Sequence, residues 1–376
     1  MKEVTIIQRI LPQYRIDFFE GLRDSLKREG VKLQLVYGGG DKNDALKKDE
    51  VELNWAKKIK NHRYRIFSTN LYWQPCLSYI KKSELIIVEQ ANKNLINYLL
   101  LFSKLFNKKK VAFWGHGLNR QDQKNSLSNR FKQKFINSSD WWFAYTSSVK
   151  DYLANNNYPE DQITIVQNAI NTTKIENQSK KLLDFDLDKV KAELAIQSDN
   201  IGIYCGGIYS EKRIPFLIQS TDLVRKKITD FHLIIIGSGE EVELLKGLIS
   251  DKPWIHYLGP KFEEEKIRLF KISKVFLMPG LVGLAILDAF ATTTPLITTR
   301  YPFHSPEIEY LENNFNGIIT KNDVGEYADK VVQVLSNQSL LQKLRSGCEL
   351  SSKKYTLEQM VNNFKNGILN CLNTIE

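Results

Sequence analysis

Short apolar strand patterns alternate with helix patterns along this sequence, and the alternation runs through the chain twice. The first half has a helix pattern near Ile16–Glu29 and strand patterns at Val4–Gln8, Lys32–Tyr37, Leu85–Glu89, Lys110–Trp114 and Trp141–Thr146. The second half has strand patterns at Asn200–Cys205, Phe231–Gly237, Ile255–Leu258, Lys274–Met278 and Pro295–Thr298. Strands that alternate with helices favour a mostly parallel, doubly wound sheet. The sequence therefore predicts an α/β protein with two Rossmann-like lobes.

The chain has 376 residues, which is too long for one ordinary core and fits two domains of about 150 residues each. The stretch 171–199 is polar and rich in Lys and Asp, so we interpret it as a linker with a short helix. We place the first domain at residues 1–185 and the second at 186–354. Residues 355–376 have a helical pattern, for which Thr356 is a suitable N-cap.

The composition is that of a globular protein, with 42% hydrophobic and 26% charged residues. No segment approaches the roughly 20 uninterrupted apolar residues of a membrane-spanning helix. The chain also leads from Met1 directly into a strand pattern rather than a signal peptide. The four cysteines are widely scattered, so we expect reduced structural thiols. These features predict a cytoplasmic protein.

The formal net charge of +10 calls for an acidic partner, such as nucleic acid, anionic lipid or a phosphate-bearing substrate. An apolar stretch at 95–102 is followed by Lys104, Lys108, Lys109 and Lys110, and soon after by Arg130, Lys132 and Lys134. Such a stretch beside a basic cluster suits the inner face of an anionic membrane. It equally suits an ordinary amphipathic helix with a solvated charged end. Because the sequence contains no recognised nucleic-acid reader motif, we expect no nucleic-acid partner.

Residues 275–299 have the pattern of a strand, a glycine-punctuated loop, a helix and a second strand, with a single acid, Asp288, on the helix. The N-terminus of a helix that starts near Gly283 offers unpaired N–H groups to a diphosphate. The segment resembles the signature of glycosyltransferase family 4, in which a Pro and a small residue precede a Glu, and a second Glu follows eight positions later. Aligned on Gly283 and Leu284, the second acid is Asp288, whereas the first is replaced by Gly280.

Further strings that resemble this family cover nearly the whole chain, at Ala144–Thr146, Ile165–Ile170, Pro306–Ile308 and Asn316–Gly317. The resemblance implies the GT-B fold, in which two Rossmann-like lobes face a cleft and the C-terminal helix crosses back to the first lobe. It also implies retaining transfer of a sugar from a nucleoside-diphosphate sugar, which we guess to be a UDP-sugar. No cofactor is expected beyond this co-substrate.

On the donor side, the resemblance assigns Lys212 to the diphosphate, while the family's Arg position is Gly207. A fixed cation there stabilises the charge that grows on the leaving phosphate. Arg213 could replace the missing guanidinium. Asp288 is assigned to the ribose hydroxyls. Because the first Glu is replaced by Gly280, either the protein uses a different donor sugar, or the sugar is held by the backbone amides of Leu281, Val282, Gly283 and Leu284.

On the acceptor side, His116 lies between two glycines after a strand, where the family often places a His that faces the sugar. Tyr14 and Arg15 resemble the acceptor loop, and Arg15 suits a phosphate on a lipid-linked acceptor. A helix-starting turn explains this pair almost as well. His304 and Glu307 follow a strand end near the donor pocket, either lining it or bracing its loop.

Two motifs carry less weight. Gly237-Ser238-Gly239 lacks the third glycine of a dinucleotide fingerprint, because position 242 is Val. The acids at 184, 186 and 188 have the spacing of a metal-dependent transferase, yet they lie in the polar linker, so we expect capping or solvation and no required metal.

The best hypothesis is a metal-independent retaining glycosyltransferase of the hexosyltransferase type. Its acceptor is expected to be a lipid-linked saccharide or oligosaccharide of bacterial surface polysaccharide or lipopolysaccharide synthesis. One alternative is a nucleotide-sugar epimerase of the same fold, which needs acid and base groups from both lobes. Another is a transferase relative that lost its catalytic Glu and acts as a binding or accessory protein.

Overall fold

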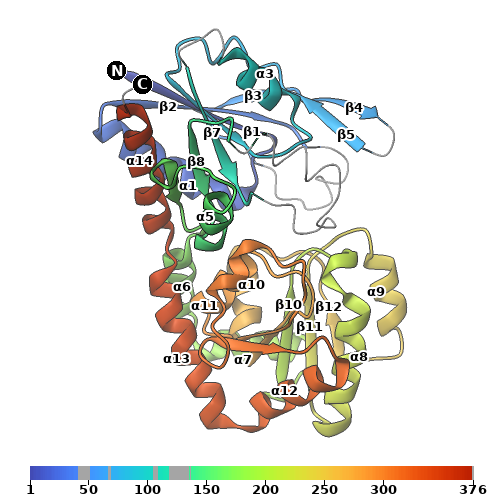
Figure 1. Ribbon diagram of the computed structural model, residues 1–376. Helices are drawn as coiled ribbons and strands as arrows, with labels where there is room; N and C mark the ends of the chain where they lie inside the picture. Colours follow the sequence, from blue (N-terminus) through green and yellow to red (C-terminus); the bar gives the residue numbers. More distant parts are fainter. Residues whose placement is uncertain (41–50, 67–68, 105–108, 118–134, 136, 375–376) are drawn as a thin grey trace. The chain divides into compact units, whose positions relative to one another are not determined.

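The computed structural model describes residues 1–40, 51–66, 69–104, 109–117, 135 and 137–374, and these form two compact units (Figure 1). Unit 1 comprises Met1–Ile170 and Leu357–Glu376, and unit 2 comprises Asn171–Thr356. The division lies earlier than the predicted boundary after residue 185. The polar stretch 171–199 is not a free linker, because it forms α6 (Thr172–Lys181) and α7 (Asp184–Glu193). These helices pack on α10 (Glu263–Lys271), and α6 also packs on α11 (Ala285–Ala291), all within unit 2.

Unit 1 is built on a seven-stranded parallel sheet with the order β3-β2-β1-β6-β7-β8-β9. Its strands are β1 (Lys2–Gln8), β2 (Val31–Gly38), β3 (Lys57–Ile59), β6 (Leu85–Glu89), β7 (Lys110–Gly115), β8 (Trp141–Ala144) and β9 (Ile163–Ile165). The central strands are nearly continuous runs of buried residues, since helices cover both faces of the sheet.

Successive residues of a strand point to opposite faces, and β7 shows which helices lie on each side. Phe113 packs into a cluster with residues of α3 (Leu95–Ser103) and α5 (Ser147–Ala154). Its neighbour Trp114 packs on the other face against Phe18 and Phe19 of α1 (Ile16–Arg28) and Phe364 of α14 (Leu357–Asn373). Unit 1 is therefore a three-layer α/β sandwich.

The C-terminal helix α14 belongs to unit 1, as the GT-B resemblance implied. The ring of Phe364 stacks on Phe143 of β8 with 4.2 Å between centroids, and it lies edge-on to Phe18. Gly367 allows this close approach, because an added Cβ would lie 2.5 Å from the Thr164 hydroxyl oxygen and 2.7 Å from the Phe143 ring. The helix thus fills the face of the sheet beside α1 (Figure 1).

Unit 2 repeats the architecture with a six-stranded parallel sheet in the order β12-β11-β10-β13-β14-β15. Its strands are β10 (Ile201–Cys205), β11 (His232–Ile236), β12 (Ile255–Tyr257), β13 (Val275–Leu277), β14 (Leu296–Thr299) and β15 (Gly317–Thr320). Its remaining helices are α8 (Ile214–Lys227), α9 (Val242–Ile249), α12 (Val324–Ser336) and α13 (Gln338–Lys354). The Asp323 and Asn337 side chains accept backbone N–H bonds that begin α12 and α13.

Unit 1 also carries a two-stranded antiparallel hairpin, β4 (His62–Ile66) and β5 (Thr69–Trp73), which the sequence patterns did not predict. The described residues also form short 3₁₀ turns, at η1 (Gln13–Arg15), η2 (Glu160–Gln162), η3 (Ser210–Lys212) and η4 (Pro306–Tyr310). Within the described ranges, no helix combines the length and the apolar character needed to cross a membrane.

Candidate functional site

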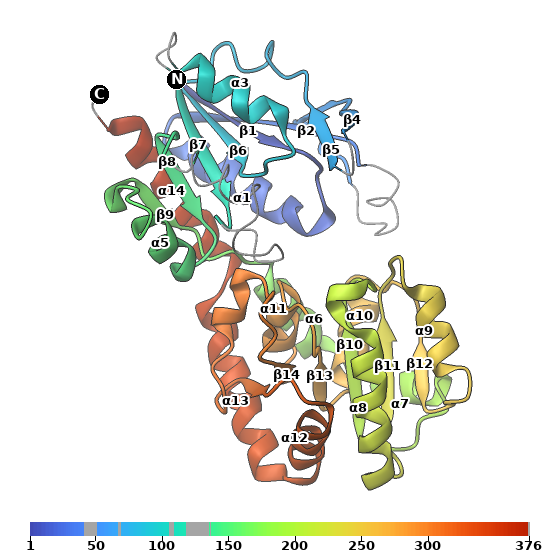
Figure 2. The ribbon, with the colours of Figure 1, turned by 45° about the vertical axis from the view of Figure 1, so that its right-hand side comes forward.

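The candidate site of unit 2 lies at the carboxyl ends of β10 and β13, which are neighbours at the centre of the sheet (Figure 2). The loop after β10 leads through η3 into α8, and the loop after β13 leads directly into α11. Ligands of open α/β sheets bind at this edge, where loops and helix N-termini converge. The predicted donor residues between Gly207 and Glu307 all come from these two loops, from α11 or from the segment after β14.

Lys212 ends η3 and is buried, with only 6% of its surface exposed. Its ammonium group donates a 2.6 Å hydrogen bond to the Leu281 carbonyl and lies 3.8 Å from the Met278 sulfur. Gly206 lies next to this ammonium group, since a Cβ on Gly206 would lie 3.8 Å from Lys212 Nζ. Burial lowers the pKa of Lys212 to about 8, although the nearby Glu211 and Glu307 charges oppose this shift. The lysine is thus a desolvated cation at the strand end.

Gly280 is the position that aligns in the sequence with the first Glu of the family 4 signature, and the structure leaves no room for a side chain there. A Cβ on Gly280 would lie 2.3 Å from the Glu211 carbonyl oxygen and 2.6 Å from the carbonyl carbon and oxygen of Lys212. The loop after β13 lies directly on η3, where the Leu281 N–H donates to the Glu211 carbonyl at 2.8 Å. Any side chain at position 280 would therefore force two backbone segments apart.

The loop amides differ in their availability. Besides the Leu281 N–H, the Val282 N–H is also used inside the protein, where it donates to His304 Nδ1 at 3.0 Å. His304 Nε2 donates in turn to the Thr299 carbonyl at 2.9 Å, so this pattern assigns a neutral imidazole. His304 therefore braces the loop. Among the described residues, no acceptor lies at hydrogen-bond distance from the N–H groups of Gly283 and Leu284.

Arg213 does not take the place of the missing guanidinium at Gly207. Its guanidinium donates to the Asn322 side chain at 2.6 Å, approaches the Pro279 carbonyl at 3.4 Å and lies over the Phe216 ring. These contacts tie η3 to the loop after β13. At Gly207, an added Cβ would lie 2.4 Å from the Tyr209 ring, so an aromatic side chain already fills that space.

Asp288 lies on α11 and is 6% exposed. Its carboxylate forms a 2.7 Å ion pair with Lys266 of α10. Burial is the largest single influence on Lys266 and disfavours its charged form, but the charge and hydrogen bond of Asp288, together with the charges of Cys205 and Glu263, outweigh it and raise the pKa of the lysine above its usual value. Burial raises the pKa of Cys205, at the end of β10, to about 12. The nearby charges of Lys266 and Lys212 act to lower this pKa, and that of Asp288 acts to raise it. Two lysines and one aspartate therefore share this strand end.

Glu307 supplies a second buried acid near Lys212. It lies in η4, is 3% exposed, and its charge contributes to the pKa of Lys212. The segment is held on the loop after β13 by the Ser305 N–H, which donates to the Val282 carbonyl at 3.0 Å. Glu307 therefore lies within electrostatic range of Lys212, although the two residues are far apart in the sequence.

In unit 1, the structure separates the predicted acceptor residues by exposure. His116 follows β7 and is exposed, with its ring edge-on to Tyr145 at 5.9 Å. Arg15 is 3% exposed and donates to the Asn168 side chain at 2.7 Å, and its guanidinium lies 4.9 Å from the Trp114 ring centroid. These internal contacts make Arg15 a packing residue and do not support its predicted phosphate contact. Tyr14 is 44% exposed.

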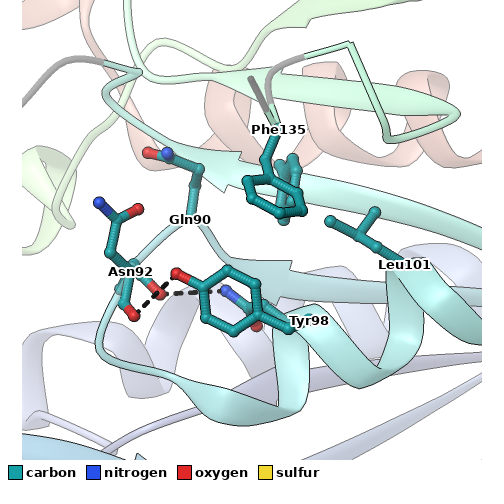
Figure 3. A pocket seen from close by; sticks show the side chains of 8 residues that line it. Gln90, Asn92, Tyr98, Leu101 and Phe135 are labelled. Carbon is teal, nitrogen blue, oxygen red and sulfur yellow. Dashed lines mark hydrogen bonds between the residues drawn. The ribbon is translucent and has the colours of Figure 1, made fainter. Parts of the chain in front are cut away.

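A small pocket opens at the carboxyl end of β6, between α3 and β7 (Figure 3). The amide side chains of Gln90 and Asn97 line it together with the rings of Tyr98 and Phe135. Asn97 donates to the carbonyls of Glu89 and Ala91, and no donor among the described residues reaches its buried Oδ1 atom. The pocket is thus lined by side-chain amides and aromatic rings, beside a buried amide oxygen.

The described lysines of the basic cluster after α3, which the sequence suggested for a membrane surface, make contacts within the protein. Lys104 pairs with Asp140 at 2.6 Å, Lys109 donates to the Ile80 carbonyl at 2.6 Å, and Lys110 donates to the Cys371 carbonyl at 2.8 Å. These three lysines therefore make intramolecular contacts. The other members of the predicted cluster, Lys108, Arg130, Lys132 and Lys134, lie outside the described residues.

The two motifs of lesser weight have structural explanations. Gly237 packs against the loop after β10, where an added Cβ would lie 1.8 Å from the Gly206 carbonyl oxygen. Asp186 accepts from the Leu183 N–H at 3.1 Å and so caps α7. No group of three or more His, Cys, Asp or Glu side chains in the described ranges is arranged to hold a metal ion.

Comparison with known proteins gives a family match for most of unit 2. Residues 186–349 match the family model described as Glycosyl transferases group 1. An uncharacterized glycosyltransferase of Methanocaldococcus jannaschii is 21% identical over 65% of this chain and 64% of its own length. A poly(ribitol-phosphate) alpha-N-acetylglucosaminyltransferase of Staphylococcus aureus is 21% identical over 65% of this chain and 54% of its own length. The matched regions span less than two thirds of these relatives.

Solved structures are similar over both units. A glycosyltransferase from Rickettsia africae has a TM-score of 0.72 at 17% identity and covers 99% of both chains. Anabaena HepE, solved in complex with UDP-glucose, has a TM-score of 0.72 at 13% identity, covering 98% of this chain and 99% of its own. Together with the two parallel sheets and the returning helix α14, these similarities show that the chain has the GT-B fold and that residues 186–349 match the group 1 glycosyl transferases.

Proposed function

We propose that this protein is a retaining glycosyltransferase that moves a sugar from a nucleoside-diphosphate sugar to a glycan acceptor. The observation that carries the proposal is the desolvated Lys212 at the end of β10, with the Lys266–Asp288 ion pair beside it. Lys212 and Lys266 place two cations at this strand end, alongside the acids Asp288 and Glu307, and Lys266 is the one that is paired with Asp288. The ammonium group of Lys212 is therefore the cation that suits a diphosphate. The family match of residues 186–349 supports the same activity.

In the proposed reaction, the bond between the anomeric carbon and the diphosphate oxygen breaks as the acceptor oxygen bonds to that carbon on the same face. The acceptor proton passes to the departing phosphate oxygen, so no separate general base is required. Lys212 stabilises the charge that grows on the diphosphate, and the N–H groups of Gly283 and Leu284 add hydrogen bonds. Asp288 contacts the ribose hydroxyls, with Lys266 fixing the carboxylate. No metal takes part.

We assign the role of the missing family Glu to Glu307. Its burial and its electrostatic effect on Lys212 place a carboxylate near the cation, while position 280 has no room for a side chain. The site thus obtains an acid for the donor sugar from η4 instead of from the loop after β13. This hypothesis explains how a site without the first Glu of the signature stays active.

The nature of the substrates is inferred from similar proteins. HepE was solved with UDP-glucose, and Staphylococcus aureus TarM was solved with UDP and alpha-GlcNAc-glycerol. A lipopolysaccharide outer core galactosyltransferase, WaaB, has the same fold. We therefore propose a UDP-sugar donor and a surface-glycan acceptor, lipid-linked or oligosaccharide. His116, exposed at the end of β7, is the proposed contact on the acceptor side.

The proposal is tested by thermal-shift screening against UDP-, GDP- and dTDP-sugars, followed by turnover assays with each donor that binds. A donor present at 100 times its dissociation constant should add about 2.7 kcal/mol of stability. Products then separate the hypotheses, because transfer or donor hydrolysis supports the transferase and a changed sugar configuration supports an epimerase. Donor binding without turnover on any acceptor would contradict the transferase and favour an accessory protein.

A further inference from the structure

The segment 56–83 of unit 1 contains no Asp or Glu and seven cations, namely Lys57, Lys58, Lys60, Arg63, Arg65, Lys81 and Lys82. This local excess of +7 compares with +10 for the whole chain. This stretch is one of two strongly basic parts of the sequence, the other being residues 104–134 with a local excess of +8, and it contains the hairpin β4–β5. Such a concentration creates a local field that attracts an anionic partner.

The register of the hairpin gives it two different faces. Tyr64 pairs with Leu71 and Ile66 with Thr69, so these side chains share one face, whereas Arg63 and Arg65 lie on the other. All five residues of β4 are exposed, and Tyr64 and Ile66 expose 52% and 50% of their surfaces. The hairpin thus presents an aromatic and aliphatic face, with Arg63 and Arg65 on the opposite face, at the rim of unit 1 (Figures 1 and 2).

The hairpin is held in place at its base. The Tyr72 N–H donates to the Lys93 carbonyl at 2.7 Å, and the Arg9 guanidinium lies 5.1 Å from the Tyr72 ring. Trp73 packs against the core of unit 1. Because an isolated two-stranded hairpin is only marginally stable in water, these contacts are what fix its exposed strand.

We propose that the β4–β5 hairpin is the surface through which this protein contacts an anionic lipid bilayer. Tyr64 and Ile66 enter the interfacial region, where amphipathic rings and aliphatic side chains are stable. The basic residues of the segment, among them Lys60 and Arg65, attract the anionic surface through their charge. A second copy of the chain is a poorer occupant, since pairing two β4 strands would bring their arginines together. The lysines after α3 that the structure describes make intramolecular contacts instead.

The test is flotation of the full chain with vesicles of phosphatidylcholine containing phosphatidylglycerol, and with vesicles of phosphatidylcholine alone. We expect the protein to float only with the anionic vesicles. The variant Lys60→Gln/Arg65→Gln should weaken this binding about tenfold or more, given the contribution of each basic residue near an anionic surface. Tyr64→Ser/Ile66→Ser should weaken it too, most visibly at high salt, where the electrostatic attraction is screened.

The matched control is Lys226→Gln/Lys343→Gln, which removes the same charge from α8 and α13 of unit 2 and should float like the wild type. Thermal unfolding of each variant shows that the fold is retained. Equal flotation of the hairpin variants and the control, or wild-type binding to neutral vesicles alone, would overturn the proposal. Hairpin-dependent binding to single-stranded or duplex DNA in place of vesicles would do so as well. The assay uses no nucleotide sugar, so its outcome is independent of the proposed transferase activity.

Discussion

Each of the two units buries a cation after its first central strand, and the two cations have different surroundings. Arg15 ends η1 between β1 and α1, and Lys212 ends η3 between β10 and α8. The guanidinium of Arg15 is enclosed by Asn168, by aromatic rings and by Met360 of α14. Lys212 instead lies beside glycine and donates to one loop carbonyl. In unit 1 this position of a Rossmann-like lobe serves packing, and we propose that in unit 2 it serves ligand binding.

The largest expected effect is that of Lys212→Met. Loss of a cation at the departing diphosphate should reduce turnover about 100- to 1000-fold. Thermal stability should change little, because removing a charge that burial disfavours offsets the loss of the hydrogen bond to the Leu281 carbonyl. Donor turnover and the melting temperature are measured on the same preparation, with Lys226→Met as the control. A variant that loses stability and activity in parallel would show that Lys212, like Arg15, serves packing.

Gly280→Glu, which restores the family's residue, should reduce both stability and turnover. The new Cβ would meet the backbone at Glu211 and Lys212, so η3 must move and Lys212 moves with it. Overpacking of this kind costs about 1–3 kcal/mol. Denaturant unfolding and donor turnover are compared with those of Gly247→Ala, because nothing lies within 4 Å of a Cβ at Gly247. Higher turnover in Gly280→Glu would mean that the loop can accept the acid and that our steric explanation is wrong.

Arg15→Met should show the opposite pattern to Lys212→Met. The substitution leaves the Asn168 side-chain oxygen without its donor, which should lower the free energy of unfolding by about 1–3 kcal/mol. Turnover per folded molecule should stay near that of the wild type. Arg15→Lys tests the planar stacking separately, because lysine keeps the charge without the flat guanidinium. If Arg15→Met loses turnover with long lipid-linked acceptors at unchanged stability, the original acceptor-phosphate prediction is right.

The smallest effect expected is a pH dependence that only Lys212 can give, since an arginine stays charged. As pH rises through about 8, Lys212 loses its charge in the free protein, so kcat/KM should fall. Stability should change in the other direction, because the unfolded lysine holds its proton up to its usual pKa of 10.5. Between these values the unfolded state binds more protons, and the contribution of Lys212 to stability rises with pH. Lys212→Arg should move the fall of kcat/KM to higher pH, and an unmoved profile would assign it to another group.

The strands and their order in two lobes were within reach of the sequence, because buried parallel strands are short apolar runs between helix patterns. The exposed β4 escaped notice, since its residues are mostly basic and polar and no core fixes their alternation. The stretch 171–199 was interpreted as a linker from its polarity. Only two residues of α6, Thr172 and Ile175, are buried, and so small an apolar face is hard to recognise in a sequence.

At the candidate site, Lys212 and Asp288 were predicted from the resemblance to the motifs of family 4. The sequence could not show that the surroundings of Arg15 and Lys212 differ. One of the residues that bury the guanidinium of Arg15 is Met360, which lies near the other end of the sequence. Gly280 looked like a lost acid for the same reason. The groups that exclude a side chain there belong to Glu211 and Lys212, and their proximity is a property of the fold.

The return of α14 to unit 1 has a consequence for the synthesis of the protein. The aromatic face formed by Phe18, Trp114 and Phe143 packs against Phe364, so it stays uncovered while the whole of unit 2 is translated. Unit 2 is contiguous and can fold as soon as it emerges from the ribosome, but unit 1 begins first and is completed last. During that interval unit 1 is the aggregation-prone part of the nascent chain, and a truncation that removes α14 makes this state permanent.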